Sequence, residues 1–210
     1  MTGKTHTAVG MATALMVTRP TRPVDIVAAL TLGAMGGLMP DIDVQTSEIA
    51  KIYRYISAAS WVILLLATLM HRFDFGAAYH RYAGSDYYTI LCGVVGLMIY
   101  MYIGCNTEHR TFTHSLLGTF LASFCVYSMG IGYTDAFAAG YVSHLILDLL
   151  NYRDVHILWP FKGFSLRLCS ASGRVNSAVR IIALSVIALF LVGYVARYSF
   201  LSSIILRRFY

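Results

Sequence analysis

Residues 140–151 read GYVSHLILDLLN, an apolar stretch interrupted by two ionisable side chains, His144 and Asp148. The two residues are four positions apart, so on a helix they lie on one stripe and can hold a single ion together. An ionisable pair inside an apolar helix is costly unless it is partnered, which favours a functional role. A buried structural pair, with neutral His hydrogen-bonded to Asp, explains the motif equally well when the motif is taken alone.

The composition around this stretch is that of a membrane protein. Hydrophobic residues make up 58% of the 210 residues and charged residues only 12%, and the mean hydropathy is +0.65. A soluble domain carries about twice that charged fraction. The length favours one integral-membrane domain spanning residues 1–210. The net charge of +6 comes from scattered residues, without the basic cluster of a nucleic-acid-binding arm.

Seven apolar segments divide the chain, which predicts an all-α polytopic membrane bundle with about 5–7 membrane segments. The first two segments match full spans least well, and we expect them to form a partly embedded helical hairpin that turns at residues 19–23, where two prolines lie. The segments are Thr5 to Thr18, Ile26 to Pro40, Tyr55 to Met70, Tyr87 to Thr107, Ser115 to Thr134, Ala136 to Tyr152 and Ile181 to Ala196.

Alternating helix directions bring four polar clusters to one membrane face. The start of the first segment, the end of the second, the start of the fifth and the end of the sixth all lie at that face. The clusters contain four histidines and three carboxylates, which we predict to be metal ligands: His6, Asp41, Asp43, His109, His114, His144 and Asp148.

Each of the other motifs is weaker alone than in this constellation. In MPDID, residues 39–43, Asp41 and Asp43 can both turn inward, one as a ligand and one as a general base. A solvated helix end is the more common explanation of such carboxylates. In EHRTFTHS, residues 108–115, we expect His109 in an approach loop and His114 in the first helical turn, capped by Thr111 or Thr113.

Imidazole and carboxylate ligands without thiolate suit zinc, with manganese or iron as alternatives. The seven side chains predict one to three such ions. Clustered metals lower the pKa of a bound water and hold phosphoryl oxygens during attack by that water. Because one of Asp41 and Asp43 is the expected general base, we predict both as catalytic residues. Arg110, Lys162, Arg167 and Arg174 are each able to neutralise an anionic substrate or to meet lipid phosphates, and Arg110 is the predicted substrate contact.

These motifs resemble the YdjM-like family of membrane-bound, predicted metal-dependent hydrolases. The resemblance rests on PDID, HRTFTHS and GYVSHLILDLLN followed by HILWPF, in that order from residue 6 to about residue 161. The family is regarded as distantly similar to zinc-dependent phospholipase C and the P1-type nucleases. The resemblance implies that His109, His114, His144 and Asp148 are metal ligands, that His6 is an N-terminal ligand, and that Asp41 or Asp43 is a ligand or base.

The leading hypothesis is therefore a membrane-embedded metallohydrolase of a phosphate ester, such as a phospholipid or a lipid-linked phosphate. The alternatives are a non-enzymatic membrane protein with a structural metal or His-Asp cluster, and an ion-coupled transporter. We expect an integral protein of a bacterial or archaeal inner membrane, with membrane lipid and a phosphate ester as partners and no nucleic acid. The membrane face that carries the polar clusters has nine Lys and Arg residues and the opposite face has seven, a difference too small to decide which face is cytoplasmic. The oligomeric state is open.

Overall fold

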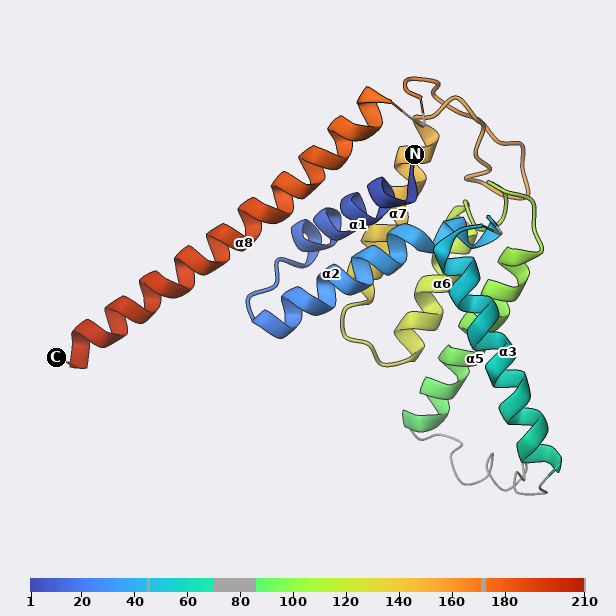
Figure 1. Ribbon diagram of the computed structural model, residues 1–210, viewed down its shortest axis with the longest axis horizontal. Helices are drawn as coiled ribbons and strands as arrows, with labels where there is room; N and C mark the ends of the chain where they lie inside the picture. Colours follow the sequence, from blue (N-terminus) through green and yellow to red (C-terminus); the bar gives the residue numbers. More distant parts are fainter. Residues whose placement is uncertain (45, 70–85, 171–172, 210) are drawn as a thin grey trace.

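The computed structural model describes residues 1–44, 46–69, 86–170 and 173–209, which form seven α-helices and a short 3₁₀ helix, η1 (Figure 1). Each predicted segment corresponds to one α-helix, so the all-α prediction is confirmed; residue 70, the predicted end of the third segment, lies outside the described residues. The bounds are α1 Gly3–Thr18, α2 Pro23–Leu38, η1 Met39–Asp43, α3 Glu48–Leu69, α5 Asp86–Cys105, α6 Leu116–Ser128, α7 Thr134–Leu149 and α8 Arg174–Phe209.

Helices α1 and α2 form the predicted hairpin. Helix α1 ends at Thr18, and Arg19 adopts a left-handed backbone conformation with φ 45°, its N–H bonding to the carbonyl of Leu15. Helix α2 begins at Pro23, which is favourable because proline fixes φ for a first helical turn and lacks an N–H that would have no partner there. The turn thus follows from the two prolines.

Glycines let α1, α2 and α7 approach one another until their backbones touch. A Cβ added to Gly33 of α2 would lie 2.6 Å from the carbonyl oxygen of Gly10 in α1, and one added to Gly36 would clash with the backbone at Phe137 of α7. Only a residue without a side chain fits such contacts. The three helices therefore form a tight unit, which carries His6 on α1 and His144 on α7.

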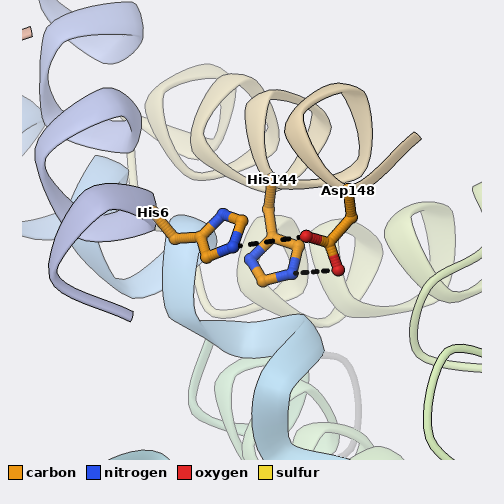
Figure 2. Close-up of side chains that lie close together, drawn as sticks. All are labelled: His6, His144 and Asp148. Atoms are coloured by element: carbon orange, nitrogen blue, oxygen red, sulfur yellow. Dashed lines mark ion pairs between the residues drawn. The ribbon is translucent and has the colours of Figure 1, made fainter. Parts of the chain in front are cut away.

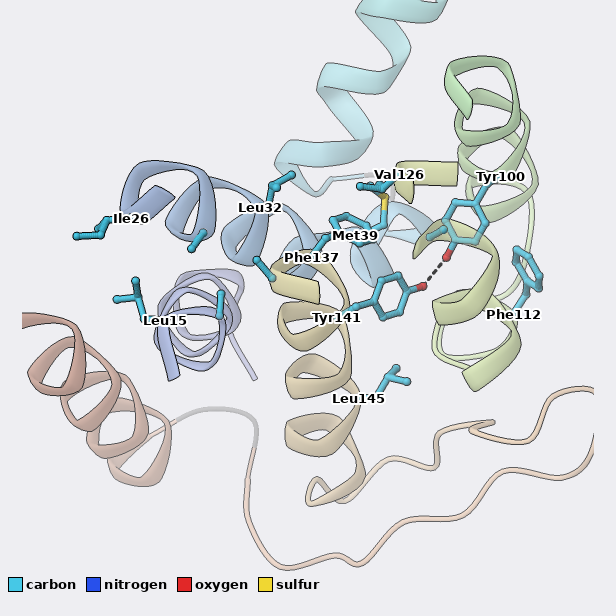
Figure 3. Close-up of a cluster of buried hydrophobic side chains, with 14 residues drawn as sticks. Leu15, Ile26, Leu32, Met39, Tyr100, Phe112, Val126, Phe137, Tyr141 and Leu145 are labelled. Atoms are coloured by element: carbon cyan, nitrogen blue, oxygen red, sulfur yellow. Dashed lines mark hydrogen bonds between the residues drawn. The ribbon is translucent and has the colours of Figure 1, made fainter. Parts of the chain in front are cut away.

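The buried core is centred on α7 (Figure 3). Tyr141 and Phe137 are its largest fully buried side chains, and Leu15 of α1 packs into the same cluster. The Tyr141 hydroxyl donates to the backbone carbonyl of Thr113 and is also hydrogen-bonded to the Tyr100 hydroxyl of α5. Because buried hydroxyls need such partners, these bonds fix α7 and α5 against the loop that precedes α6.

The outer surface is strongly apolar. Helix α8 extends away from the rest of the molecule (Figure 1), and its Leu189 and Val192 are 72% and 65% exposed. Such side chains are solvated by lipid in a bilayer. Among the residues that the structure describes, two stretches are long and apolar enough to cross a membrane, Pro23–Asp43 and Arg174–Arg197. The helices Thr89–Cys105 and Leu116–Ser128 are apolar but shorter. The membrane fold is thereby supported, while the count of 5–7 segments stays a prediction.

Candidate metal centre

The structure gathers the seven predicted side chains at one end of the molecule. They come from four separate parts of the chain. His6 lies on α1, Asp41 and Asp43 on η1, His109 and His114 on the loop before α6, and His144 and Asp148 on α7. Three overlapping groups have ligand atoms within 4.8 Å of one another: His6, His144 and Asp148; Asp41, His114 and His144; Asp43, His109 and His114.

His144 is fully buried, and a backbone carbonyl sets its tautomer. Its Nδ1 lies 2.7 Å from the carbonyl oxygen of Gly37 at the end of α2. A carbonyl oxygen only accepts, so Nδ1 carries the hydrogen and Nε2 presents a lone pair in the neutral ring. A hydrogen bond from the far nitrogen to a carbonyl is the usual means of orienting a metal-binding histidine. The tight packing of α2 against α7 places Gly37 for this role.

His114 is also fully buried and is oriented in the same way. Its Nδ1 lies 3.2 Å from Oδ2 of Asp43 and 3.1 Å from Oγ1 of Thr113, whose hydroxyl itself donates to Asp43 at 2.8 Å. Both neighbours accept from Nδ1, so Nε2 again presents the lone pair. The two Nε2 atoms of His114 and His144 face each other at 3.2 Å. Two lone pairs at this distance repel unless a cation or a proton lies between them.

Two carboxylates complete a cage around this point. Oδ2 of Asp148 lies 3.6 Å from Nε2 of His114 and 3.8 Å from Nε2 of His144. Oδ1 of Asp41 lies 3.9 Å and 3.7 Å from the same two atoms. Ligand atoms at about 2.0–2.1 Å from a tetrahedral zinc are about 3.3–3.4 Å apart. The separations come close to that geometry, so the donor set fits a small divalent ion.

His6 approaches the other oxygen of Asp148 (Figure 2). Its Nε2 lies 3.4 Å from Oδ1, and its ring stacks on that of His144 with a centroid distance of 3.7 Å. Within the described part of the chain, its buried Nδ1 has no hydrogen-bond partner. The N-terminal amine of Met1 also lies 3.0 Å from Oδ1. Asp148 therefore faces the histidine pair with one oxygen and His6 with the other, as a bridging carboxylate would.

Asp43 lies behind His114 and organises the loop. Its fully buried carboxylate is 2.9 Å from Nδ1 of His109 and accepts from the backbone N–H of Arg110 at 3.1 Å, in addition to its contacts with Thr113 and His114. His109 is 37% exposed in its side chain and meets Asp43 rather than the facing Nε2 atoms. Asp43 and His109 therefore lie on the Nδ1 side of His114, outside the cage that faces the two Nε2 atoms.

Arg110 is buried beside Asp148. One guanidinium nitrogen lies 2.9 Å from Oδ2 of Asp148 and another donates to the carbonyl of Arg153 at 2.8 Å. Its backbone is left-handed, with φ 68°. This conformation is uncommon for a residue with a side chain, and it turns the chain between His109 and His114. Arg110, the predicted substrate contact, thus lies against a carboxylate of the cage.

One local prediction is wrong. Helix α6 begins at Leu116, so His114 precedes the helix, and its cap is Ser115, whose hydroxyl accepts from the N–H of Gly118 at 2.9 Å. Thr111 and Thr113 lie farther from the start of the helix, and their hydroxyls donate to the carbonyl of Glu108 and to Asp43. Serine is an equally good cap.

Sequence reasoning also missed contributors to the centre. The Gly37 carbonyl carries no residue-type signal, although the glycines at positions 33, 36 and 37 of α2 could have indicated a close helix contact. The motif around Thr113 indicates only a cap, and the contact between the Met1 amine and Asp148 has no counterpart in the motifs.

Fold and centre together define an all-helical membrane protein with a buried His/Asp cluster that could hold a metal ion. A family model described as "YdjM inner membrane protein" matches residues 1–206. The chain therefore belongs to the YdjM inner membrane protein family, which confirms the resemblance and the membrane localisation expected from the sequence. No curated protein and no solved structure shows significant similarity to the chain.

Proposed function

We propose that this chain is a membrane-embedded, metal-dependent hydrolase of a phosphate ester, with zinc as its metal. The observation that carries the proposal is the pair of facing Nε2 atoms of His114 and His144, 3.2 Å apart, with both Nδ1 atoms already committed to acceptors. A cation between them removes the repulsion of their lone pairs and also neutralises the carboxylates alongside.

The donor chemistry supports zinc over harder ions. Two imidazole nitrogens and carboxylate oxygens are typical zinc ligands, whereas magnesium and calcium prefer oxygen alone. Manganese and iron accept the same donors. In the proposal His114, His144 and Asp148 hold one ion, and His6 with Oδ1 of Asp148 forms the start of a second position.

Asp41 is the best candidate for the general base. Its side chain is 19% exposed, against 3% or less for His114, His144 and Asp148. A catalytic site keeps a position open to water, and Asp41 lies on this more accessible side. There its carboxylate would take a proton from an attacking water. A bound divalent ion would act as a Lewis acid and stabilise negative charge on a phosphoryl oxygen.

A membrane substrate is supported by the chain between α7 and α8. Its apolar side chains Leu158, Phe161 and Leu168 are exposed beside the basic residues Arg153 and Lys162. This mixture suits the headgroup level of a bilayer. The segment is tied directly to the centre, because the N–H of residue 156 bonds to the carbonyl of residue 110 and the N–H of residue 116 bonds to the carbonyl of residue 157. A phospholipid or lipid-linked phosphate would be presented at this level.

The first test is the metal content of protein purified in detergent without chelator, measured by elemental mass spectrometry. We expect at least one zinc per chain in the wild type and in a His156→Ala control, whose histidine lies outside the centre. The His144→Ala/Asp148→Ala double variant should lose it. Wild-type protein that stays metal-free after zinc is added would refute the proposal and leave a proton shared between the two histidines as the explanation.

Turnover separates an enzyme from a structural metal site. Zinc-loaded wild type should release product from phospholipid or other phosphate-ester substrates, whereas Asp41→Asn should keep its zinc and lose activity by about 100-fold or more, as expected for loss of a general base. Equal activity of the two proteins would exclude Asp41 as the base. Zinc binding without turnover of any phosphate ester would favour the non-enzymatic alternative.

A further inference from the structure

A crevice of about 560 Å³ opens at the other end of α1, between the turn that follows this helix and the middle of α8. The volume is within the usual range for small-ligand sites. The residues that line it include Arg19 from the turn and Leu189, Phe190, Gly193, Tyr194 and Arg197 from α8.

The crevice lies at the membrane level opposite the metal centre. Helices α1 and α8 start side by side, because the N–H of Thr2 donates to the side chain of Asn176 at 3.1 Å. From there α1 and α8 both run away from the N-terminus (Figure 1). The candidate span Arg174–Arg197 has 24 residues, which at about 1.5 Å per residue is about 36 Å. This exceeds the hydrocarbon thickness of about 30 Å, so Arg197 reaches the headgroups of the far leaflet.

Two arginines at the crevice lack an ion-pair partner in the part of the chain that the structure describes. Arg19 and Arg197 form no ion pair with any of the residues that the structure describes. Arg22, three residues further along the same turn, differs because it forms a two-bond pair with Asp25 at 2.7 and 2.8 Å. The crevice therefore offers two uncompensated guanidinium groups, which bind phosphate well.

The wall between these arginines is apolar and open. Leu189 is 72% exposed, and Phe190 lies next to it. A Cβ added to Gly193 would meet no atom within 4 Å, so the glycine leaves a gap along the helix instead of allowing a backbone contact. A free phosphate has no use for this apolar wall, whereas an acyl chain fills it and buries its surface.

We propose that this crevice binds an anionic phospholipid of the leaflet opposite the metal centre, with its phosphate between Arg19 and Arg197 and an acyl chain along Leu189 and Gly193. Juxtamembrane basic residues attract anionic lipids in this way. The length of α1 separates this site from the metal centre, so the lipid-binding proposal does not depend on the proposed enzymatic activity.

The test is binding of phosphatidylglycerol to delipidated full-length protein in detergent, followed by native mass spectrometry. We expect one tightly held lipid per chain, and at least tenfold weaker binding of phosphatidylcholine with the same acyl chains. The Arg19→Gln/Arg197→Gln variant should bind phosphatidylglycerol at least tenfold more weakly than the wild type. Gly193→Leu, which fills the gap while keeping both charges, should have a similar effect. The Arg22→Gln control should bind as the wild type does.

Three outcomes would overturn the proposal. Equal affinity for the two lipids would show that the arginines do not select an anionic headgroup. An unchanged affinity in Gly193→Leu would show that no acyl chain packs against Gly193. Competition by inorganic phosphate at millimolar concentration would identify a site for the free anion instead. We expect each variant to fold, because Arg19, Arg197 and Gly193 lie outside the buried core. Gel filtration and thermal unfolding of each variant verify this.

Discussion

The unit formed by α1, α2 and α7 and the long helix α8 have similarly apolar sequences but opposite surroundings. In the three-helix unit, Gly33 and Gly36 lie against neighbouring backbones, and the ionisable pair His144 and Asp148 is buried. In α8 most side chains between residues 174 and 197 are exposed, and of these residues only Asn176 and Ala183 are buried. Apolar composition alone therefore does not distinguish a helix that faces protein from one that faces lipid.

Small residues and ionisable side chains make that distinction. Without a hydrophobic driving force in the bilayer, helices associate where small residues allow close packing. An ionisable side chain then remains among the packed helices because exposure to lipid costs more. The site and the close packing thus occur in the same helices for one physical reason, and the following substitutions test this difference from the largest expected effect to the smallest.

Asp148→Asn should have the largest effect. The carboxylate is nearly fully buried and contacts His6, Arg110 and the N-terminal amine, so its loss leaves buried positive charge without a counter-charge. Breaking a buried pair in this way costs about 3–5 kcal/mol of folding free energy. Chemical unfolding in detergent measures the change, and Asp154→Asn, at an exposed carboxylate, is the control. A loss below about 1 kcal/mol of folding free energy would mean that the negative charge of Asp148 does not stabilise the fold.

Zinc should stabilise the wild type by a smaller amount. A ligand that binds only the folded state at 100 times its dissociation constant adds about 2.7 kcal/mol. We expect the unfolding midpoint to rise with zinc concentration in the wild type and to stay constant in His114→Ala, which lacks one of the two facing nitrogens. An equal rise in both proteins would show that zinc binds elsewhere.

The sequence predicts the helices of this protein well because their signals are local. Charged and proline-containing stretches bound each apolar segment, and the structure has a helix at each one. The gathering of His6, Asp41, His114, His144 and Asp148 also followed from the sequence, because alternating helix directions bring distant segment ends together. Neither inference required knowledge of a side-chain conformation.

The division of labour within the centre could not be predicted in this way. Asp41 faces the two Nε2 atoms whereas Asp43, two residues later, lies behind His114, and both are aspartates in one short motif. Their difference depends on the path of η1 and on the left-handed backbone of Arg110. The Gly37 carbonyl that orients His144 is a backbone atom, which any residue type supplies. Such roles depend on three-dimensional geometry that residue spacing does not encode.

Gly36→Ala tests the packing of the three-helix unit directly. The added methyl group would overlap the backbone at Phe137, and a backbone atom cannot rotate away as a side chain can. Overpacking of this kind costs about 1–3 kcal/mol. Because the shift separates α2 from α7, the Gly37 carbonyl should also move from His144 and weaken zinc binding. Thermal unfolding with and without zinc measures both effects, and a fully stable variant with normal zinc affinity would contradict the tight contact.

Gly193→Ala is the same substitution on α8 and should have the smallest effect. The new methyl group meets no atom within 4 Å, so it faces lipid or the open crevice. Substitutions at such positions change stability by about 0.5 kcal/mol or less, and alanine also favours the helix over glycine. The unfolding midpoint and zinc affinity should equal those of the wild type. A loss comparable to that of Gly36→Ala would show that α8 packs against protein at Gly193, and the contrast between the two regions would no longer hold.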